Sequence, residues 1–422
     1  MISSEKNSQI RVLMLVPSLP PLPVGGAEKQ ALLLADALIS KSVTVQFIMP
    51  GEGNVGGETQ ISGVKVYRLN SWPNRIFKYL SSRRKKSRPL VDRIEYDDRR
   101  EVTNQLSTTV SWPTVVYYNI FYYHALFLLR RKKKEFDIIH AHTMEWSAIV
   151  AVRLGRALNK PVIIKDSTMN GFQSLARFPQ GKSKQQLIAK SAHFVAMTDS
   201  IHENLLNAGI SASCIRKIPN GIDTTELPDT KKSNNHSTTV LFVGNLYQQP
   251  AKGVDLLLNA WSTVHQKFPN VLLQIVGDGV NNAYREFVNR LGIAGTVDFA
   301  GRQHDLTNYY SNADIFVLPS RREGMSNALM EAMLYGLPSV ATDISGNRDL
   351  LKNRVNGILV PAADIASLAE AIAWMLSHPD ERLEYGLKAR ETILKHYDIN
   401  NIADQYISLY QNLLNKTHSF LK

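Results

Sequence analysis

Glu323 and Glu331 are two acidic residues with seven residues between them, placed around the expected start of a helix. Ser326 or Asn327 suits the N-cap position, and the residues that follow favour a helix. The apolar run Asp314–Pro319 before them predicts a short buried strand. Where a strand runs into a capped helix, free backbone N–H groups and the positive end of the helix dipole point at one spot. Such a spot suits a phosphate group.

The two acids flank the expected phosphate position, one before the helix and one a turn inside it. Carboxylates placed in this way can accept hydrogen bonds from hydroxyl groups on either side of a phosphate. A nucleotide sugar has this layout, because its diphosphate lies between a ribose and a hexose. The spacing therefore favours a nucleotide-sugar site.

Five further motifs follow one another along the chain. In order they are Gly25-Gly26-Ala-Glu-Lys29, Asp137-Ile-Ile-His140-Ala-His142, Ile218-Pro-Asn-Gly-Ile-Asp223, Val243-Gly-Asn-Leu246 with Lys252-Gly253, and Ile275-Val-Gly-Asp-Gly279. Each is weak by itself. Together with the Glu-x7-Glu pattern, in this order and at these spacings, the series resembles the family 4 glycosyltransferases, which are retaining enzymes of the GT-B fold. The resemblance extends over most of the chain.

Short apolar runs alternate with amphipathic stretches, which predicts α/β units with parallel sheets. The expected strands are Arg11–Val16, Val43–Ile48, Val64–Arg68, Ile138–His140, Val162–Ile164, His193–Ala196, Ile215–Ile218, Val240–Val243, Val271–Val276, Val297–Ala300, Ile315–Leu318, Ser339–Thr342 and Gly357–Val360. The expected helices include Glu28–Ser40, Trp146–Leu158, Ser200–Ala208 and Ile399–Leu414. The polar stretch Thr224–Thr239 predicts a linker.

The resemblance implies two doubly wound, Rossmann-like domains facing each other across a cleft. Residues 1–220 would form the acceptor-binding domain and residues 221–398 the nucleotide-sugar-binding domain. The C-terminal helix, about residues 399–422, would return to complete the first domain. Ligands of such sheets bind beyond the carboxyl ends of the strands.

The resemblance also assigns roles around the two acids. Glu331 would hold the ribose hydroxyls, Glu323 would contact the donor sugar, and Lys252 would bind phosphate oxygens. The donor-binding residues implied are Gly26, Asn245, Lys252, Gly277, Arg302, Glu323, Gly324, Met325, Ser326, Asn327 and Glu331, and the catalytic ones are Glu323, His142 and Lys252. The family usually has an arginine where this chain has Asn245, so either another basic residue supplies the missing charge, with Arg302 and Arg321 as candidates, or the diphosphate is held less tightly.

The candidates in the first half of the chain lie at expected strand ends. Paired glycines at Gly25 and Gly26 permit a positive φ and a close approach of backbone to ligand, or form a plain turn. His140 and His142 end a strand, and at the family's position His142 would polarise a hydroxyl. Asp166 stands beside the place where the family often has a further histidine, and we expect it to contact the acceptor.

Composition bounds the remaining possibilities. The chain has 422 residues and a net charge of +12, and its 44% hydrophobic and 20% charged residues are normal for a globular protein. One cysteine, Cys214, excludes an internal disulfide and fits a reducing cytosol. Neither a signal peptide nor an apolar run of about twenty residues is evident.

Positive charge is concentrated between Arg75 and Lys134, where fifteen Lys and Arg face five Asp and Glu. An uncharged, aromatic-rich helix is expected at Val115–Leu129, and Arg130–Lys134 follows it. Tyrosine and basic residues beside an apolar helix suit a membrane interface, although a half-buried helix with a charged end explains them equally well. The predicted membrane-contact cluster is Arg83, Arg84, Lys85, Lys86 and Arg88. Nucleic acid is not an expected partner, because no binding motif accompanies the charge.

Two motifs resemble other nucleotide sites but lack their context. Gly51–Gly56 matches a dinucleotide fingerprint, yet the segment after it, Gln60–Leu69, is expected to form a strand instead of a helix. Gly181-Lys182-Ser183 imitates the end of a P-loop, but Ala176 stands where its first glycine should be. The chain contains no Asp-x-Asp pair and no zinc-ligand spacing, so we expect no metal.

The sequence therefore predicts a retaining, metal-independent hexosyltransferase that uses a UDP- or GDP-linked donor and no other cofactor. Its acceptor would be a lipid-linked or membrane-associated glycan in surface polysaccharide or glycolipid synthesis. It would work in the cytoplasm, at the inner face of the cell membrane. The alternatives are a non-hydrolysing sugar-nucleotide epimerase of the same architecture and a non-enzymatic basic protein that binds membranes or nucleic acid.

Overall fold

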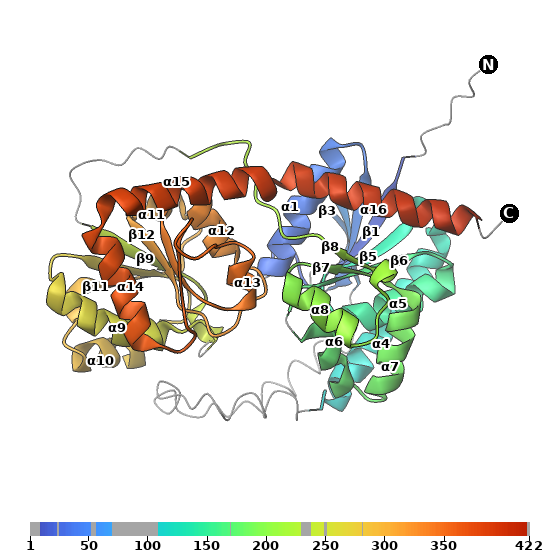
Figure 1. Ribbon diagram of the computed structural model, residues 1–422. Helices are drawn as coiled ribbons and strands as arrows, with labels where there is room; N and C mark the ends of the chain where they lie inside the picture. The colour runs from blue at the N-terminus through green and yellow to red at the C-terminus, as the bar shows by residue number, and fades with distance from the viewer. Residues whose placement is uncertain are drawn as a thin grey trace, which may run out of the picture. The chain divides into compact units, whose positions relative to one another are not determined.

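The computed structural model describes residues 9–22, 25–51, 56–69, 109–168, 170–228, 238–248, 251–280 and 282–419. Within these ranges the chain forms two compact units (Figure 1). Unit 1 contains the described residues up to Gly221 and those from Ile399 onward, and unit 2 contains Ile222–Asp398. The predicted membrane-contact cluster, Arg83, Arg84, Lys85, Lys86 and Arg88, lies outside the described residues.

Unit 1 is built on an eight-stranded sheet with the order β3-β4-β2-β1-β5-β6-β7-β8. Its strands are β1 (Arg11–Leu15), β2 (Thr44–Pro50), β3 (Gly57–Ile61), β4 (Val64–Leu69), β5 (Ile138–Ala141), β6 (Val162–Asp166), β7 (His193–Ala196) and β8 (Ile215–Lys217). Every neighbouring pair is parallel except the edge pair β3–β4. The order reverses between β1 and β5, and such a switch point opens a crevice at the carboxyl ends of the strands.

Helices cover both faces of this sheet (Figure 1). They are α1 (Gly26–Ser40), α4 (Trp112–Arg131), α5 (Trp146–Leu158), α6 (Gly171–Ser174), α7 (Gly181–Ser191), α8 (Asp199–Asn207) and α16 (Ile399–Ser419). On one face, Val12 and Met14 of β1 share a core cluster with residues of α1 and α16. Because side chains alternate along a strand, Leu13 and Leu15 face the opposite layer. The C-terminal helix α16 thus completes the core of unit 1.

Unit 2 has a six-stranded, fully parallel sheet with the order β11-β10-β9-β12-β13-β14. Its strands are β9 (Thr239–Val243), β10 (Leu272–Val276), β11 (Val297–Gly301), β12 (Ile315–Leu318), β13 (Ser339–Thr342) and β14 (Ile358–Val360). Its helices are α9 (Val254–Lys267), α10 (Asn282–Arg290), α11 (Thr307–Asn312), α12 (Asn327–Leu334), α13 (Ser345–Arg348), α14 (Ile365–Ser377) and α15 (Pro379–His396). Here the order reverses between β9 and β12, so the switch point lies between these two strands.

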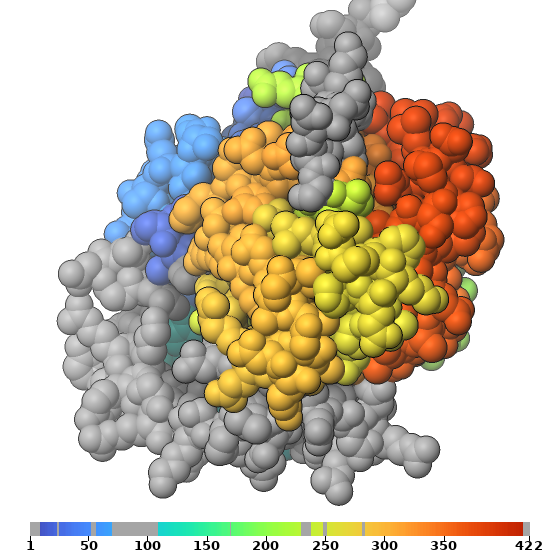
Figure 2. Space-filling view, turned by 90° about the vertical axis from the view of Figure 1, so that its left-hand side faces the viewer, coloured from blue at the N-terminus to red at the C-terminus, as the bar shows by residue number. Residues whose placement is uncertain are grey.

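The core of unit 2 explains the continuous apolar runs in the sequence of its strands. Trp261 of α9 is fully buried in one apolar cluster with residues from the central strands and from α14. Helix α14 packs directly against α9, and Figure 2 shows the yellow α9 segment beside the red C-terminal helices of this unit. Both faces of a parallel sheet must be covered, which is why its strands read as continuous apolar runs.

The expectation of two parallel-sheet α/β domains is confirmed, and two details are wrong. The strand expected at Val64–Arg68 lies within β4, but Gln60–Leu69 as a whole is not one strand. This segment contains a hairpin turn at Ser62 and Gly63, where both φ angles are positive (48° and 79°), and β3 and β4 pair antiparallel across it. Two positive φ angles define a tight hairpin turn, and Gly63 adopts one without steric cost. The expected linker also ends earlier, because Thr239 already belongs to β9.

Candidate active site

The loops that follow β9 and β12 are joined at the switch point of unit 2. Gly253 has a φ of +65°, and a Cβ atom there would lie 2.0 Å from the carbonyl oxygen of Pro319. The Arg321 N–H donates a hydrogen bond of 2.8 Å to the Ala251 carbonyl. Only glycine allows this approach. The turn before α9 is therefore held against the end of β12.

This contact brings Lys252 and Glu323 together, although 71 residues separate them. Lys252 Nζ lies 2.6 Å from Glu323 Oε1, and both side chains are largely buried. Ser320 Oγ donates a second hydrogen bond, of 2.8 Å, to the same carboxylate oxygen. A cation and a carboxylate are thus held in defined positions just before α12.

Helix α12 begins where the sequence predicts. Ser326 is its N-cap, and its Oγ accepts a hydrogen bond of 3.3 Å from the Leu329 N–H. No acidic residue stands in the first turn of α12. The positive end of its dipole is therefore not neutralised by its own sequence. The loop before it, which contains Gly324 and Met325, is backed by α13, where a Cβ on Gly346 would lie 1.7 Å from the Gly324 carbonyl oxygen.

Glu331 has a buried partner that the sequence analysis did not identify. Tyr310 of α11 donates a hydrogen bond of 2.8 Å from its hydroxyl group to Glu331 Oε2. Its ring stacks on Tyr335 with a centroid distance of 5.2 Å. Burial, and then the charge of Glu331, raise the pKa of Tyr310 well above its ordinary value. Tyr310 therefore stays protonated and orients the Glu331 carboxylate.

The structure also describes the two arginines that could replace the missing family arginine. Arg321 forms a bidentate ion pair with Asp255 at 2.8 Å for each nitrogen, and its role at the donor stays a prediction. Arg302 is exposed in the loop after β11, an edge strand separated from β9 by β10. Asn245 is exposed, and its Oδ1 accepts a hydrogen bond of 2.9 Å from the Tyr247 N–H. Asn245 thus shapes its own turn.

Gly277 is required where the ends of β9 and β10 meet. Its φ is +155°, and a Cβ there would lie 1.7 Å from the Gly244 carbonyl oxygen. The Gly244 N–H in turn donates 3.0 Å to the Val276 carbonyl. The two glycines let the carboxyl ends of β9 and β10 pack together without side chains between them.

In unit 1, His140 belongs to β5 and His142 follows directly after it, on the face covered by α1 and α16. The His140 and His142 rings are buried and stack with centroids 4.2 Å apart, and His140 Nδ1 lies 2.9 Å from the Tyr410 hydroxyl oxygen of α16. Burial, and then the charge of Lys165, lower the pKa of His140 to about 3. The pKa of His142 is also lowered, by burial first and then by His140 and Lys165. Both imidazoles are neutral at pH 7.

The glycine pair after β1 does not adopt a positive φ. Gly25 has a φ of −91° and caps α1, and its N–H donates 3.0 Å to Glu28 Oε2. Gly26 is the first residue of that helix. The pair therefore caps α1 at the switch point of unit 1, and the contact of Gly26 with the donor stays a prediction.

Asp166 and Lys165 are neighbours at the end of β6 and point to opposite faces of the sheet. Asp166 accepts a hydrogen bond of 3.2 Å from the Thr168 N–H, and burial raises its pKa to about 7. Lys165 Nζ donates 2.8 Å to Asn220 Oδ1, and burial lowers its pKa to about 7. Lys165 was not among the expected site residues, since nothing in its local pattern indicates burial.

Lys165 is expected to make the free energy of unfolding rise with pH between about 7 and 10.5. In this window the unfolded chain holds a proton that the folded chain has released, so stability increases with pH and is lost as pH falls through the folded-state pKa. The slope should approach about 1.4 kcal/mol per pH unit. Urea unfolding of a Lys165→Met variant should lack this slope. The matched variant Lys190→Met, at an exposed site on α7, should keep it; the same slope in both variants would contradict the assignment.

Two family descriptions match this chain. "Glycosyl transferases group 1" matches residues 237–378, and "Glycosyltransferase Family 4" matches residues 91–226. Together the two ranges span more than half of the sequence. The chain belongs to the family 4 type of glycosyltransferases. It is therefore a transferase, and this decides against both the epimerase and the non-enzymatic protein considered above.

Curated relatives agree with this glycosyltransferase assignment. A Haemophilus influenzae protein described as an uncharacterized glycosyltransferase is 25% identical over 90% of this chain and 95% of its own length. The phosphatidyl-myo-inositol mannosyltransferase of Mycolicibacterium smegmatis is 27% identical over 66% of this chain and 72% of its own. An Escherichia coli UDP-Gal:alpha-D-GlcNAc-diphosphoundecaprenol alpha-1,3-galactosyltransferase is 26% identical over 67% and 77%.

Solved structures share the fold of this glycosyltransferase. Sucrose-phosphate synthase from Thermosynechococcus elongatus has a TM-score of 0.72 at 20% identity, covering 97% of this chain and 100% of the other. Anabaena HepE in complex with UDP-glucose has a TM-score of 0.69 at 19% identity, covering 96% and 100%. The expected GT-B fold is confirmed.

Two further properties of this glycosyltransferase concern membranes and metals. None of the helices in the described ranges is both long and apolar enough to cross a bilayer. Among the same residues, no three His, Cys, Asp or Glu side chains gather as a metal site.

Proposed function

We propose that this glycosyltransferase transfers a hexose from a UDP- or GDP-linked donor to a lipid-linked or membrane-associated glycan, with retention of anomeric configuration. The Lys252–Glu323 pair in front of α12, with Glu331 behind it, carries the donor part of the proposal. The acceptor part draws on relatives whose names specify phosphatidyl-myo-inositol and a diphosphoundecaprenol glycan.

The Lys252–Glu323 pair suggests how the donor would bind. A diphosphate would draw Lys252 Nζ from Glu323 to its own oxygens, since ammonium binds phosphate as a point charge. Glu323 would then accept a hydrogen bond from a hydroxyl of the hexose. The backbone N–H groups of Met325, Ser326 and Asn327, at the start of α12, would bind the distal phosphate.

The same groups would promote transfer. Negative charge grows on the diphosphate as its bond to the sugar breaks, and Lys252 and the α12 dipole would stabilise that charge. Glu331, oriented by Tyr310, would hold the ribose hydroxyls. In unit 1, neutral His142 can hydrogen-bond a hydroxyl through a ring nitrogen, while the acceptor role of Asp166 stays a prediction. We propose that the reaction needs no metal, because Lys252 supplies the charge at the diphosphate, so EDTA should leave the rate unchanged.

Isothermal calorimetry with UDP, GDP and their sugar conjugates tests the donor site. Lys252→Ala and Glu331→Ala should each raise the donor Kd at least about tenfold, because each removes a hydrogen bond to a charged group. Lys352→Ala and Glu370→Ala, at exposed positions of unit 2, are matched controls that should bind as the wild type does. Unchanged affinity in both site variants would defeat the assignment.

The stereochemical outcome of the transfer can be read from the anomeric configuration of the product. The anomeric proton coupling in the NMR spectrum of the product shows retention or inversion. An extract of bacterial polyprenyl-diphosphate glycans would serve as acceptor. A product with the opposite anomeric configuration to the donor would contradict the retaining mechanism.

We place the enzyme at the inner face of the cell membrane, where nucleotide sugars and lipid-linked glycans meet.

A further inference from the structure

We propose that one face of α4 docks on an anionic lipid surface. This proposal rests on the proposed function, because a lipid-linked acceptor would lie in such a surface, and it assigns the contact to a described helix. The docking face consists of Trp112, Tyr123, Phe127, Arg130 and Arg131.

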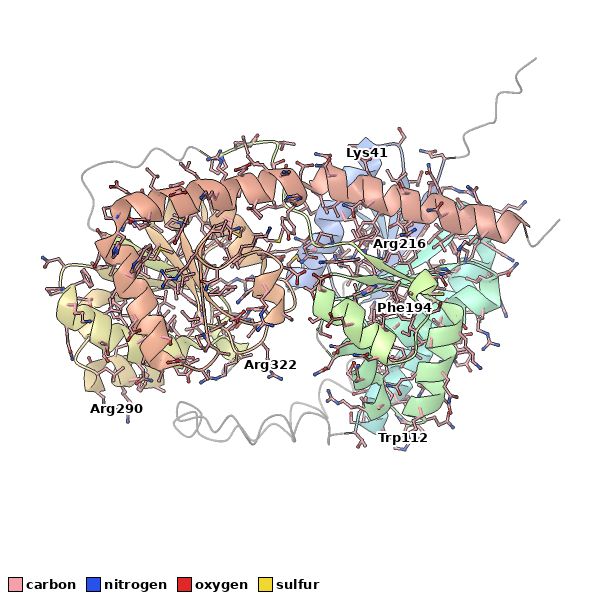
Figure 3. The ribbon with its side chains drawn as sticks, viewed as in Figure 1. Lys41, Trp112, Phe194, Arg216, Arg290 and Arg322 are labelled. Atoms are coloured by element: carbon pink, nitrogen blue, oxygen red, sulfur yellow. The ribbon has the colours of Figure 1, made fainter. Side chains whose placement is uncertain are left out.

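Helix α4 is apolar on both of its sides. Its inner side is buried within unit 1 and packs against α5; its buried residues are Phe121, Tyr122, Ala125, Leu126 and Leu129. On the outer side, Trp112, Tyr123 and Phe127 are 73%, 61% and 63% exposed. Trp112 is labelled at the first residue of α4 in Figure 3. A helix that is apolar all round normally lies inside a protein or in contact with lipid.

The exposed residues share one stripe. With 3.6 residues per turn, the docking-face residues Trp112, Tyr123, Phe127, Arg130 and Arg131 fall within about 100° of one another around the helix axis. The stripe therefore runs along the whole helix, with aromatic rings along it and two guanidinium groups at its C-terminal end. Arg131 lies over the Phe127 ring, with its Cζ 4.3 Å from the centroid.

The helices beside α4 carry the same sign of charge. Helix α5 contacts both α4 and α7, and the three helices lie together in Figure 1. Between them they contain seven Lys and Arg and no Asp or Glu: Arg130, Arg131, Arg153, Arg156, Lys182, Lys184 and Lys190. The carboxylates nearest in sequence, Glu135 and Glu145, stand beyond the helix ends. Lys132 Nζ lies 3.4 Å from Glu135 Oε1. Because this ion pair compensates its charge, Lys132 is not part of the docking face.

This combination favours lipid over the other partners. Tryptophan and tyrosine have an apolar body and a polar edge, which suits the headgroup region, and arginine reaches phosphate from the same depth. Each Lys or Arg near an anionic leaflet contributes about 1 kcal/mol to binding. A protein partner would explain the aromatic residues but would not require seven cations without an intervening acid.

Sedimentation of the full-length chain with phosphatidylglycerol–phosphatidylcholine vesicles, without donor, tests the proposal. Tyr123→Ser/Phe127→Ser should lower the partition coefficient by at least about tenfold, since burying one aromatic ring is worth about that factor. The matched control is Leu383→Ser/Leu387→Ser on α15. These leucines have the same spacing and are 64% and 55% exposed, and their replacement should leave partitioning unchanged.

Charge is tested separately. Arg130→Glu/Arg131→Glu should reduce partitioning by at least about fivefold per residue, and phosphatidylcholine vesicles should bind the wild type weakly. Arg285→Glu/Arg290→Glu on α10 is the matched control. All variants should bind UDP or GDP in calorimetry as the wild type does, so loss of vesicle binding is distinguished from failure of the donor site.

Three outcomes would overturn the proposal. The wild type does not bind phosphatidylglycerol vesicles; the α4 variants bind them as well as the wild type; or sedimentation equilibrium shows a dimer that the α4 variants dissociate while vesicles are not bound. In the last case the face of α4 is an interface between two copies of the chain.

Discussion

A Glu323→Gln variant should lose at least about 100-fold in kcat for sugar transfer, a typical effect of removing one polar group aimed at the reacting centre. Glutamine has the same size, and its amide oxygen can still accept a hydrogen bond from Ser320. It lacks the charge that attracts Lys252 and orders the donor hexose. The measurement is the initial rate of nucleoside diphosphate release at saturating donor and acceptor.

A double variant separates catalysis from stability. Glu323→Gln leaves the largely buried Lys252 without its anion, and breaking such a pair costs about 3–5 kcal/mol of stability. Adding Lys252→Met removes the stranded charge, so thermal unfolding should return towards the wild-type temperature. Activity should not return, because both groups act on the donor. Recovery of kcat in the double variant would show that the pair is only structural.

A Gly253→Ala variant should weaken donor binding at least about tenfold and lower stability by about 3 kcal/mol, because it combines a left-handed backbone with a steric overlap. Its φ is +65°, and the new Cβ would lie 2.0 Å from the Pro319 carbonyl oxygen. The turn would have to withdraw from β12. Lys252 would then move away from Glu323, and the site would lose its geometry without losing a functional group.

Gly292 provides the control for this substitution. Its φ is +70°, and a Cβ there would meet nothing within 4 Å. Gly292→Ala therefore bears the backbone cost alone, about 1 kcal/mol, and should bind donor normally. Calorimetry and thermal unfolding of both variants make the comparison. Equal effects at the two glycines would contradict the role assigned to the contact between Gly253 and Pro319.

Much of this protein follows from local sequence. Alternating apolar runs determine the strands, and Ile315–Leu318 and Trp146–Leu158 have the predicted bounds because each is a strongly apolar or amphipathic segment. Ser326 is the cap that its residue type predicts, since a hydroxyl accepting from the third following N–H is a local interaction. The positions of Glu323 and Glu331 around the helix start were predictable for the same reason.

The pairing of distant side chains was decided by the tertiary structure alone. The order of strands brings the loop after β9 to the end of β12, and only this order brings Lys252 to Glu323. The same holds for Tyr310 with Glu331 and for Arg321 with Asp255. Local sequence determines which backbone conformation a segment prefers. Which segments become neighbours depends on the burial of apolar surface over the whole unit, and no short window of sequence contains that information.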